Sequence, residues 1–131
     1  MEGAADLEQP HVTGAAGEVH ALRRLSCQDV ADRRRMAEVF EGHAPQRVVH
    51  LAAQAGIRHS LTDPYTYVTA NVMGQVVMLE LVRRLENLRH FVYASSSSVY
   101  GGNEDLPFSV EDRVERPCSL YAATKRADEL I

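Results

Sequence analysis

The sequence predicts an α/β fold with three layers, in which helices flank a parallel β-sheet. Two short runs, residues 47–53 and 91–94, are apolar on both faces and rich in β-branched or aromatic side chains. Such runs are typical of strands in a parallel sheet. A segment with the spacing of a long helix separates them, as in a unit of two strands joined by a crossover helix. At 131 residues we expect one domain, residues 1–131.

The elements before residue 47 are short. Val12 begins the run Val12-Thr13-Gly14-Ala15-Ala16-Gly17, which is a candidate strand end followed by a glycine turn, and residues 25–28 form a second candidate strand. A helix is expected over residues 33–41. Asp32 is a good N-cap for it and Gly42 a good C-cap.

The next helix is expected to begin at Asp63-Pro64 and to run for about twenty residues. Four apolar residues recur at helical spacing and should form its packed stripe, namely Val68, Val72, Val76 and Leu79. His50 lies inside the preceding strand and is expected to be a core histidine. After the turn at residues 101–103, residues 104–118 carry acids and prolines, which predicts a long surface connection.

Composition excludes several classes of protein. The chain is 45% hydrophobic and 24% charged, and its net charge of -4 gives no basic surface for nucleic acid or an anionic membrane. Cys27 and Cys118 have no metal-binding spacing, so we expect two reduced thiols and no metal. The chain has neither the pattern of a signal peptide nor an apolar run long enough to span a membrane. These features predict a soluble, cytoplasmic protein.

Chemistry is expected where a serine cluster meets the last helix. Ser95, Ser96, Ser97 and Ser98 directly follow strand 91–94, and ligands bind at the carboxyl ends of parallel strands. Ser119 is a good N-cap for a helix that begins near Leu120, which puts Tyr121 and Lys125 four residues apart on one face. An ammonium stabilises the phenolate of a phenol, whose unperturbed pKa is about 10. The pair could therefore take a proton from an alcohol that a serine hydroxyl positions.

At these residues the chain resembles a known family. The run Ala94-Ser95-Ser96-Ser97-Ser98-Val99-Tyr100-Gly101, followed by Ser119-Leu120-Tyr121-Ala122-Ala123-Thr124-Lys125, looks like the extended short-chain dehydrogenase/reductases. Within them the chain is most similar to NAD-dependent nucleotide-sugar epimerases, and in particular to UDP-glucuronate 4-epimerases. Tyr-x-x-x-Lys alone is a weak signal, but here it follows the serine run, Val-Tyr-Gly and Pro107-Phe108-Ser109 in order.

The resemblance implies a Rossmann-like domain, NAD as cofactor and a UDP-sugar as substrate in carbohydrate metabolism. The activity it implies is an isomerisation of UDP-glucuronate to UDP-galacturonate through transient oxidation at C4. Tyr121 would take the C4 hydroxyl proton, Lys125 would hold the nicotinamide ribose, and Ser96 would bond the reacting oxygen.

Further site residues follow from the same resemblance. The cofactor contacts it implies, besides Tyr121 and Lys125, are Gly14, Gly17, Asp29, Val30, Leu51, Ala52, Ala53, Gln54, Asn71, Ala94 and Ser95. The substrate contacts it implies are Arg58, in a segment similar to the Ala-Gly-Val-Arg of uronate epimerases, and Ser97 and Ser98. The family's dimer surface would correspond to residues 68–85, so a homodimer is a further expectation.

The chain departs from the family in two places. Glu18 and His20 stand where the glycine motif has an apolar residue and its third glycine, and Asp29 follows Gly17 too closely for a full helix and strand. The chain also stops at Ile131, inside the expected catalytic helix. We therefore expect an incomplete Rossmann-like sheet that lacks part of the N-terminal βα unit and the C-terminal substrate domain, and little turnover from the chain alone.

Two other functions stay open. A nucleotide-sugar 4,6-dehydratase is one, although the family's dehydratases carry an acidic pair where this chain has Ser97 and Ser98. The other is a module that binds NAD or a partner without catalysis. Turnover of a UDP-sugar, abolished by Tyr121→Phe, would separate the enzymes from the module.

Overall fold

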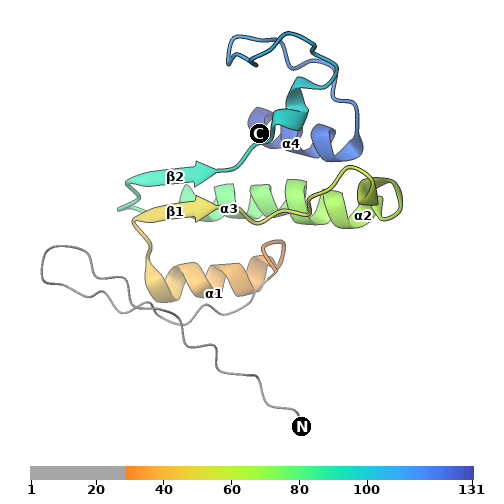
Figure 1. Cartoon of the computed structure of the whole chain (residues 1–131). Coiled ribbons are helices and arrows are strands. Elements are labelled where there is room, and N and C mark those ends of the chain that lie inside the picture. Colours follow the sequence, from red (N-terminus) through yellow and green to blue (C-terminus); the bar gives the residue numbers. More distant parts are fainter. Residues whose placement is uncertain (1–28) are drawn as a thin grey trace, which may run out of the picture.

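The computed structural model describes residues 29–131 (Figure 1). The expected glycine turn with Gly14 and Gly17, the candidate strands at Val12 and at residues 25–28, and Cys27 lie outside the described residues. In the described part the order of elements is α1 (Arg33–His43), β1 (Arg47–His50), η1 (His59–Leu61), α2 (Pro64–Tyr67), η2 (Val68–Met73), α3 (Gly74–Val82), β2 (His90–Tyr93), η3 (Ser97–Tyr100) and α4 (Leu120–Leu130).

β1 and β2 form a parallel sheet, as the sequence predicts. Val48 pairs with Phe91 and His50 with Tyr93, and the ladder continues where Ala94 N donates to His50 O at 3.1 Å. Both strands therefore end at the same edge, from which the chain leads into residues 51–54 after β1 and into the serines after β2 (Figure 1). The predicted α/β class with a parallel sheet is confirmed.

An apolar cluster lies between this sheet and two helices. Phe40 of α1 and Met78 and Val82 of α3 are buried together, and Val48 and Phe91 pack against them from the strands. The opposite face of the sheet carries Val49 and Val92, which stay 65% and 40% exposed within the described residues. Residues 29–131 thus contain one helical layer and the sheet, two of the three expected layers.

The caps of α1 agree with the sequence at one end only. Asp32 Oδ1 accepts hydrogen bonds from Arg34 N and Arg35 N at 3.1 and 3.0 Å, which confirms it as the N-cap. Gly42 is not the C-cap. The helix continues through it to Ala44, whose φ of 41° is left-handed and whose amide donates to Phe40 O. Phe40 packs in the apolar cluster and thereby holds this last turn. The preference of C-cap positions for glycine does not predict this extension of the helix.

The expected long helix begins at Pro64 with Asp63 as its N-cap, and it continues to Val82. Its middle is a π-helix, η2, which local sequence preference does not predict. The expected valine stripe is wrong, because Val68 is 48% exposed and the others are only half-buried. The buried face lies beside that stripe and consists of Tyr67, Asn71, Gly74, Gln75, Val77, Met78 and Val82.

The end of the chain agrees closely with expectation. Ser119 Oγ accepts a hydrogen bond from Ala122 N at 3.0 Å and caps α4. Between η3 and α4 the chain forms an exposed connection without helix or strand. Gly101 at its start has φ 59°, and a Cβ there would collide with the backbone of Arg116. Among the described residues no helix is long and apolar enough to cross a membrane.

Candidate active site

The serine cluster lies at the carboxyl edge of the sheet. Ser96 has extended backbone and caps η3, since its Oγ accepts from Ser98 N at 3.2 Å and donates to Ser98 Oγ at 3.1 Å. Ser97 begins the η3 turn and is exposed. η3 packs against α4, so the serine cluster and the Tyr121 helix, far apart in sequence, are neighbours.

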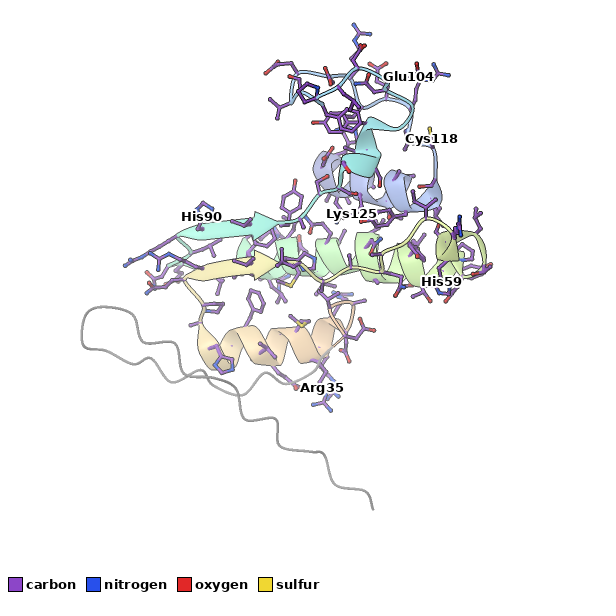
Figure 2. The ribbon with its side chains drawn as sticks, viewed as in Figure 1. Arg35, His59, His90, Glu104, Cys118 and Lys125 are labelled. Carbon is purple, nitrogen blue, oxygen red and sulfur yellow. The ribbon has the colours of Figure 1, made fainter. Side chains whose placement is uncertain are left out.

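Tyr121 and Lys125 lie one turn apart on α4, as predicted. The Tyr121 ring is half-buried and meets Tyr67 edge to face, with centroids 6.2 Å apart. Lys125 is buried, and Figure 2 shows it on the side of α4 that faces α3 and the ends of the strands. The structure thus brings Ser96, Tyr121 and Lys125 to one edge of the molecule.

Lys125 has a partner that the sequence reading did not include. Its Nζ donates to Asp128 Oδ2 at 2.7 Å, and both side chains are almost fully buried. Burial raises the pKa of Asp128 from its usual value, and the Lys125 ammonium opposes that rise. Lys125 has three N–H donors and spends one on Asp128, so two remain for other acceptors.

Asn71 connects the strand edge to α4. Its Oδ1 accepts from Gln54 N at 2.8 Å, and its Nδ2 donates to Gln54 O at 3.1 Å and to Thr124 Oγ1 at 2.9 Å. One buried side chain therefore fixes the backbone that leaves β1 relative to the helix that carries Tyr121 and Lys125. The sequence did not predict Thr124 as a partner of Asn71, and the cofactor contact expected of Asn71 stays a prediction.

Tyr67 fixes the next part of the same segment. It is fully buried, and its hydroxyl donates to Ala55 O at 2.7 Å and to Gly56 O at 2.5 Å. Its ring also lies 6.0 Å from that of His59 in η1. Arg58, just before η1, is exposed.

His50 lies at the end of β1, close to Lys125. Its side chain is buried, and burial, with a smaller contribution from the positive charge of Lys125, lowers its pKa below the usual 6.5. A neutral imidazole at neutral pH suits a core position, which agrees with the expectation for His50.

Several other predicted residues are less closely involved. Ser95 is exposed, and its hydroxyl donates to Glu129 of α4 rather than pointing free into the site. Asp29 is exposed and its Oδ1 accepts from Ala31 N at 2.9 Å, which makes it part of a local turn. Val30 packs on Gly74, where a Cβ would come within 2.7 Å of Val30 Cγ1.

The described residues suit one half of a dinucleotide. Leu51, Ala52 and Ala53 leave β1 as an exposed segment with mostly small side chains, and Gln54 at its end is held by Asn71. A small, extended backbone segment accepts a flat ring closely, and the two remaining Lys125 donors could hold ribose hydroxyls. The arrangement fits the nicotinamide half of NAD. The expected pyrophosphate contacts, Gly14 and Gly17, lie outside the described residues.

Neither a metal centre nor a deep cleft accompanies these residues in the described part. No group of three or more His, Cys, Asp or Glu side chains within residues 29–131 could hold a metal ion. A shallow depression of about 250 Å³ lies at the long connection instead, lined by Tyr100, Gly102, Asn103, Arg113, Glu115 and Arg116. None of the predicted site residues lines this depression.

Sequence reasoning missed Tyr67, Gln75, Thr124 and Asp128. Spacing could have found Asp128, because it follows Tyr121 by seven residues and Lys125 by three and so shares their helix face. Tyr67 precedes Asn71 by four residues, and the same rule applies to it. Spacing alone does not single out Tyr67 or Asp128, because an aromatic or a charged residue within a helix is usually a packing or surface residue.

Comparison with known proteins identifies the family of the chain. The family model described as GDP-mannose 4,6 dehydratase matches residues 8–131. UDP-glucuronate 4-epimerase 1 of Arabidopsis thaliana is 48% identical over 103 residues, which are 79% of this chain and 24% of that protein. Protein CapI of Staphylococcus aureus is 48% identical over 96 residues, 73% of this chain and 28% of that protein.

Solved structures agree as well. The crystal structure of UDP-glucose 4-epimerase from Brucella ovis in complex with NAD matches with a TM-score of 0.71 and 31% identity, over 79% of this chain and 31% of that one. The chain spans less than a third of the length of the curated relatives it matches. The chain therefore belongs to the NAD-dependent epimerase and dehydratase family of the extended short-chain dehydrogenase/reductases, as its sequence predicts.

Proposed function

We propose that this chain contributes the catalytic edge of an NAD-dependent UDP-glucuronate 4-epimerase. One observation carries the proposal: Tyr121 and Lys125 lie on a helix that Asn71 ties, through Thr124 and Gln54, to the backbone leaving β1. In this proposal a phenol, an ammonium and the small residues after β1 act together at one edge. Relatives that are named UDP-glucuronate 4-epimerase support the substrate class.

The residues of the chain would divide the work as follows. The cofactor, when bound, supplies a hydride acceptor that returns the hydride to the other face of C4. Tyr121, as phenolate, takes the proton of the C4 hydroxyl during oxidation and gives it back during reduction, so the chain ends unchanged. Lys125 keeps positive charge near the phenolate and binds the ribose with its two remaining donors.

Ser96 would bond the reacting oxygen. In the structure its hydroxyl proton points to Ser98 Oγ, a part-buried contact at 3.1 Å. Turning that proton toward a sugar oxygen exchanges one hydroxyl partner for another, which costs little. Ser97 and Ser98 then line the sugar side. Arg58 supplies a two-pronged donor for the carboxylate that distinguishes a uronate from a neutral sugar.

The first test is a calorimetric titration of the purified chain with NAD. We expect saturable binding that Lys125→Met weakens and Tyr121→Phe leaves within a few-fold. Turnover is then measured by separating UDP-glucuronate from UDP-galacturonate, both for the chain alone and for a relative whose matching segment is replaced by residues 29–131. Turnover by the replaced relative that survives Tyr121→Phe would overturn the proposal. NAD binding without turnover in either form would favour the non-catalytic module.

The dehydratase alternative has one observation in its favour, the description of the matching family model. The two residues after Ser96 argue against it, because Ser97 and Ser98 open η3 with hydroxyls and not with the carboxyl groups that an elimination step would use. Incubation with GDP-mannose separates the two: a 4-keto-6-deoxy product would favour a dehydratase.

A homodimer and a cytoplasmic location complete the proposal. The outward face of the long helix carries apolar side chains, with Tyr65 84% exposed and Val68 and Met73 both 48% exposed. Burying such residues against a second copy is favourable. Light scattering after size exclusion should give twice the monomer mass, and cell fractionation tests the location.

A further inference from the structure

The ion pair between Lys125 and Asp128 differs from every other ion pair of the described residues in its burial. Its side chains are 7% and 1% exposed, whereas the pair of Glu80 with Arg83, also three residues apart, is about half exposed. An exposed pair contributes little to stability. A buried pair is different, because removing one partner leaves an uncompensated charge away from water. The burial of the Asp128 carboxylate therefore depends on the positive charge of Lys125.

The long helix and α4 run side by side in the same direction. The Tyr67 ring of α2 meets that of Tyr121, and one turn later Asn71 of η2 bonds Thr124. Within the described residues, Asp128 Oδ1 is buried without a hydrogen-bond partner, while Asp128 Oδ2 accepts from Lys125 Nζ. In the described part, Lys125 is therefore the side chain that holds the Asp128 carboxylate.

We propose that Asp128 is a positioning residue for Lys125. This deepens the proposed function and rests on it, since the gain is a fixed ammonium with two N–H groups left for the cofactor. A lysine side chain has four rotatable carbon–carbon bonds to order, and a partner that orders them beforehand spares the ligand that cost. Asp128 would therefore act on affinity through Lys125 without touching the cofactor.

The sequence offers a direct probe of this pair. Lys125 is the only lysine among the 14 basic residues of the chain. Lysine labelled with ¹⁵N thus reports on one side chain without substitution, and acylation of amines reports on Lys125 and the amino terminus alone. Asp128→Asn keeps size and one acceptor but removes the charge. Glu80→Gln makes the same change in an exposed pair and serves as the matched control.

The first measurement is the ¹⁵N spectrum of the Lys125 ammonium in the wild type. We expect a resolved signal at neutral pH, because a buried, hydrogen-bonded ammonium exchanges its protons slowly. Asp128→Asn should shift or abolish the signal and speed acylation of Lys125 about tenfold, since a buried ammonium without its counter-charge releases a proton more readily. Glu80→Gln should change neither. A folded wild type without the signal, or an Asp128→Asn variant that matches the wild type, overturns the proposal.

Two further readouts guard against loss of folding. The double variant Lys125→Met with Asp128→Asn removes both charges, and it should be more stable than the sum of the single changes predicts. A double-mutant cycle in which the two substitutions have additive effects on stability would overturn the proposal. NAD titration comes last, with Asp128→Asn expected to weaken binding about tenfold and Glu80→Gln to leave it unchanged. A wild type that does not bind NAD would count against the proposed function, and the lysine signal would still decide the role of Asp128.

Discussion

Two interfaces hold the described residues together, and they are made differently. The apolar cluster joins α1, α3 and the sheet through Phe40, Met78 and Val82. The polar seam, by which we mean Asn71, Gln75, Thr124, Lys125 and Asp128, is equally well buried, and the bond from Asn71 to Thr124 joins the π-helix η2 to α4. Apolar contacts are non-directional and tolerate repacking, whereas hydrogen bonds fix distances and angles. The cluster therefore serves the fold, and the seam serves the placement of Tyr121 and Lys125.

The cost of the seam shows in its unpaired atoms. A buried polar group stabilises only when it is satisfied, and the seam holds two buried atoms without a partner in the described part. Stability accordingly comes mainly from the cluster.

Phe40→Ala should destabilise most. It empties the centre of the apolar cluster, and such changes cost about 3–5 kcal/mol of unfolding free energy. Chemical denaturation measures it, with Leu61→Ala as the control at a largely exposed site. In the fraction that stays folded we expect NAD affinity to change little, because Tyr121, Lys125 and Asn71 do not belong to the cluster. If Phe40→Ala lowered the unfolding free energy by less than Leu61→Ala does, the distinction between the apolar cluster and the polar seam would be contradicted.

Asn71→Ala should lower the stability less than Phe40→Ala does, and it should lower the affinity for NAD more. It leaves the Gln54 backbone and Thr124 without their partner, for about 2–3 kcal/mol. Asn103→Ala is the matched control, since Asn103 bonds Asp112 in the surface connection. NAD affinity should fall in the Asn71 variant alone. Equal affinity in both variants would mean that the seam does not position the cofactor strip.

Tyr67→Phe removes one hydroxyl and keeps the ring. We expect a loss of about 1 kcal/mol, since its proton is shared between the carbonyls of Ala55 and Gly56. Tyr65→Phe, at an exposed site on the same helix, should change stability by less than about 0.5 kcal/mol. Denaturation curves of the two variants measure the difference, and identical midpoints would contradict it.

The smallest effect concerns pH. The pKa of His50 is lowered in the folded chain, so below its usual 6.5 the unfolded chain binds the proton more readily. Stability should be fully present above pH 6.5 and should fall as the pH drops toward the lowered value. His50→Gln should flatten this part of the curve, with His90→Gln at the exposed start of β2 as the control. A curve that keeps its slope without His50 would show that another group causes it.

The strands and helix caps around the apolar cluster could be predicted from the sequence. The runs at Val48 and Phe91 became the paired strands, and Asp32 and Ser119 cap their helices. These signals are local, since a β-branched run or a capping side chain acts on its immediate neighbours. The valine stripe failed because periodicity alone favours the more apolar of two adjacent helix faces. The face that is buried carries Asn71 and Gln75 in place of the valines.

The polar seam could be predicted only in part. Tyr121, Lys125 and Asn71 were identified by resemblance to a family. Asp128 has only its spacing from Lys125 as a local signal, and Gln75 and Thr124 have none. Their role depends on which residue of a second helix, some fifty positions away, lies at the same level. Register between helices is set by tertiary packing, and the sequence carries no short-range record of it. The same limit applies to Ser95, whose bond to Glu129 crosses between a strand end and α4.

The π-helix has a consequence for changes of chain length. Six residues, Val68–Met73, make wider turns than an α-helix would, so this stretch holds one residue more than regular winding requires. Deleting one residue there, other than Asn71, would restore regular winding and leave the flanking turns facing almost as before, because the extra residue of the π-turn is taken up locally. The same deletion in the regular part of α3 would rotate Tyr67 by about a quarter of a turn relative to the end of that helix and separate it from Tyr121. The π-helix is thus the part of the long helix in which a chain shortened by one residue disturbs the contact with α4 least.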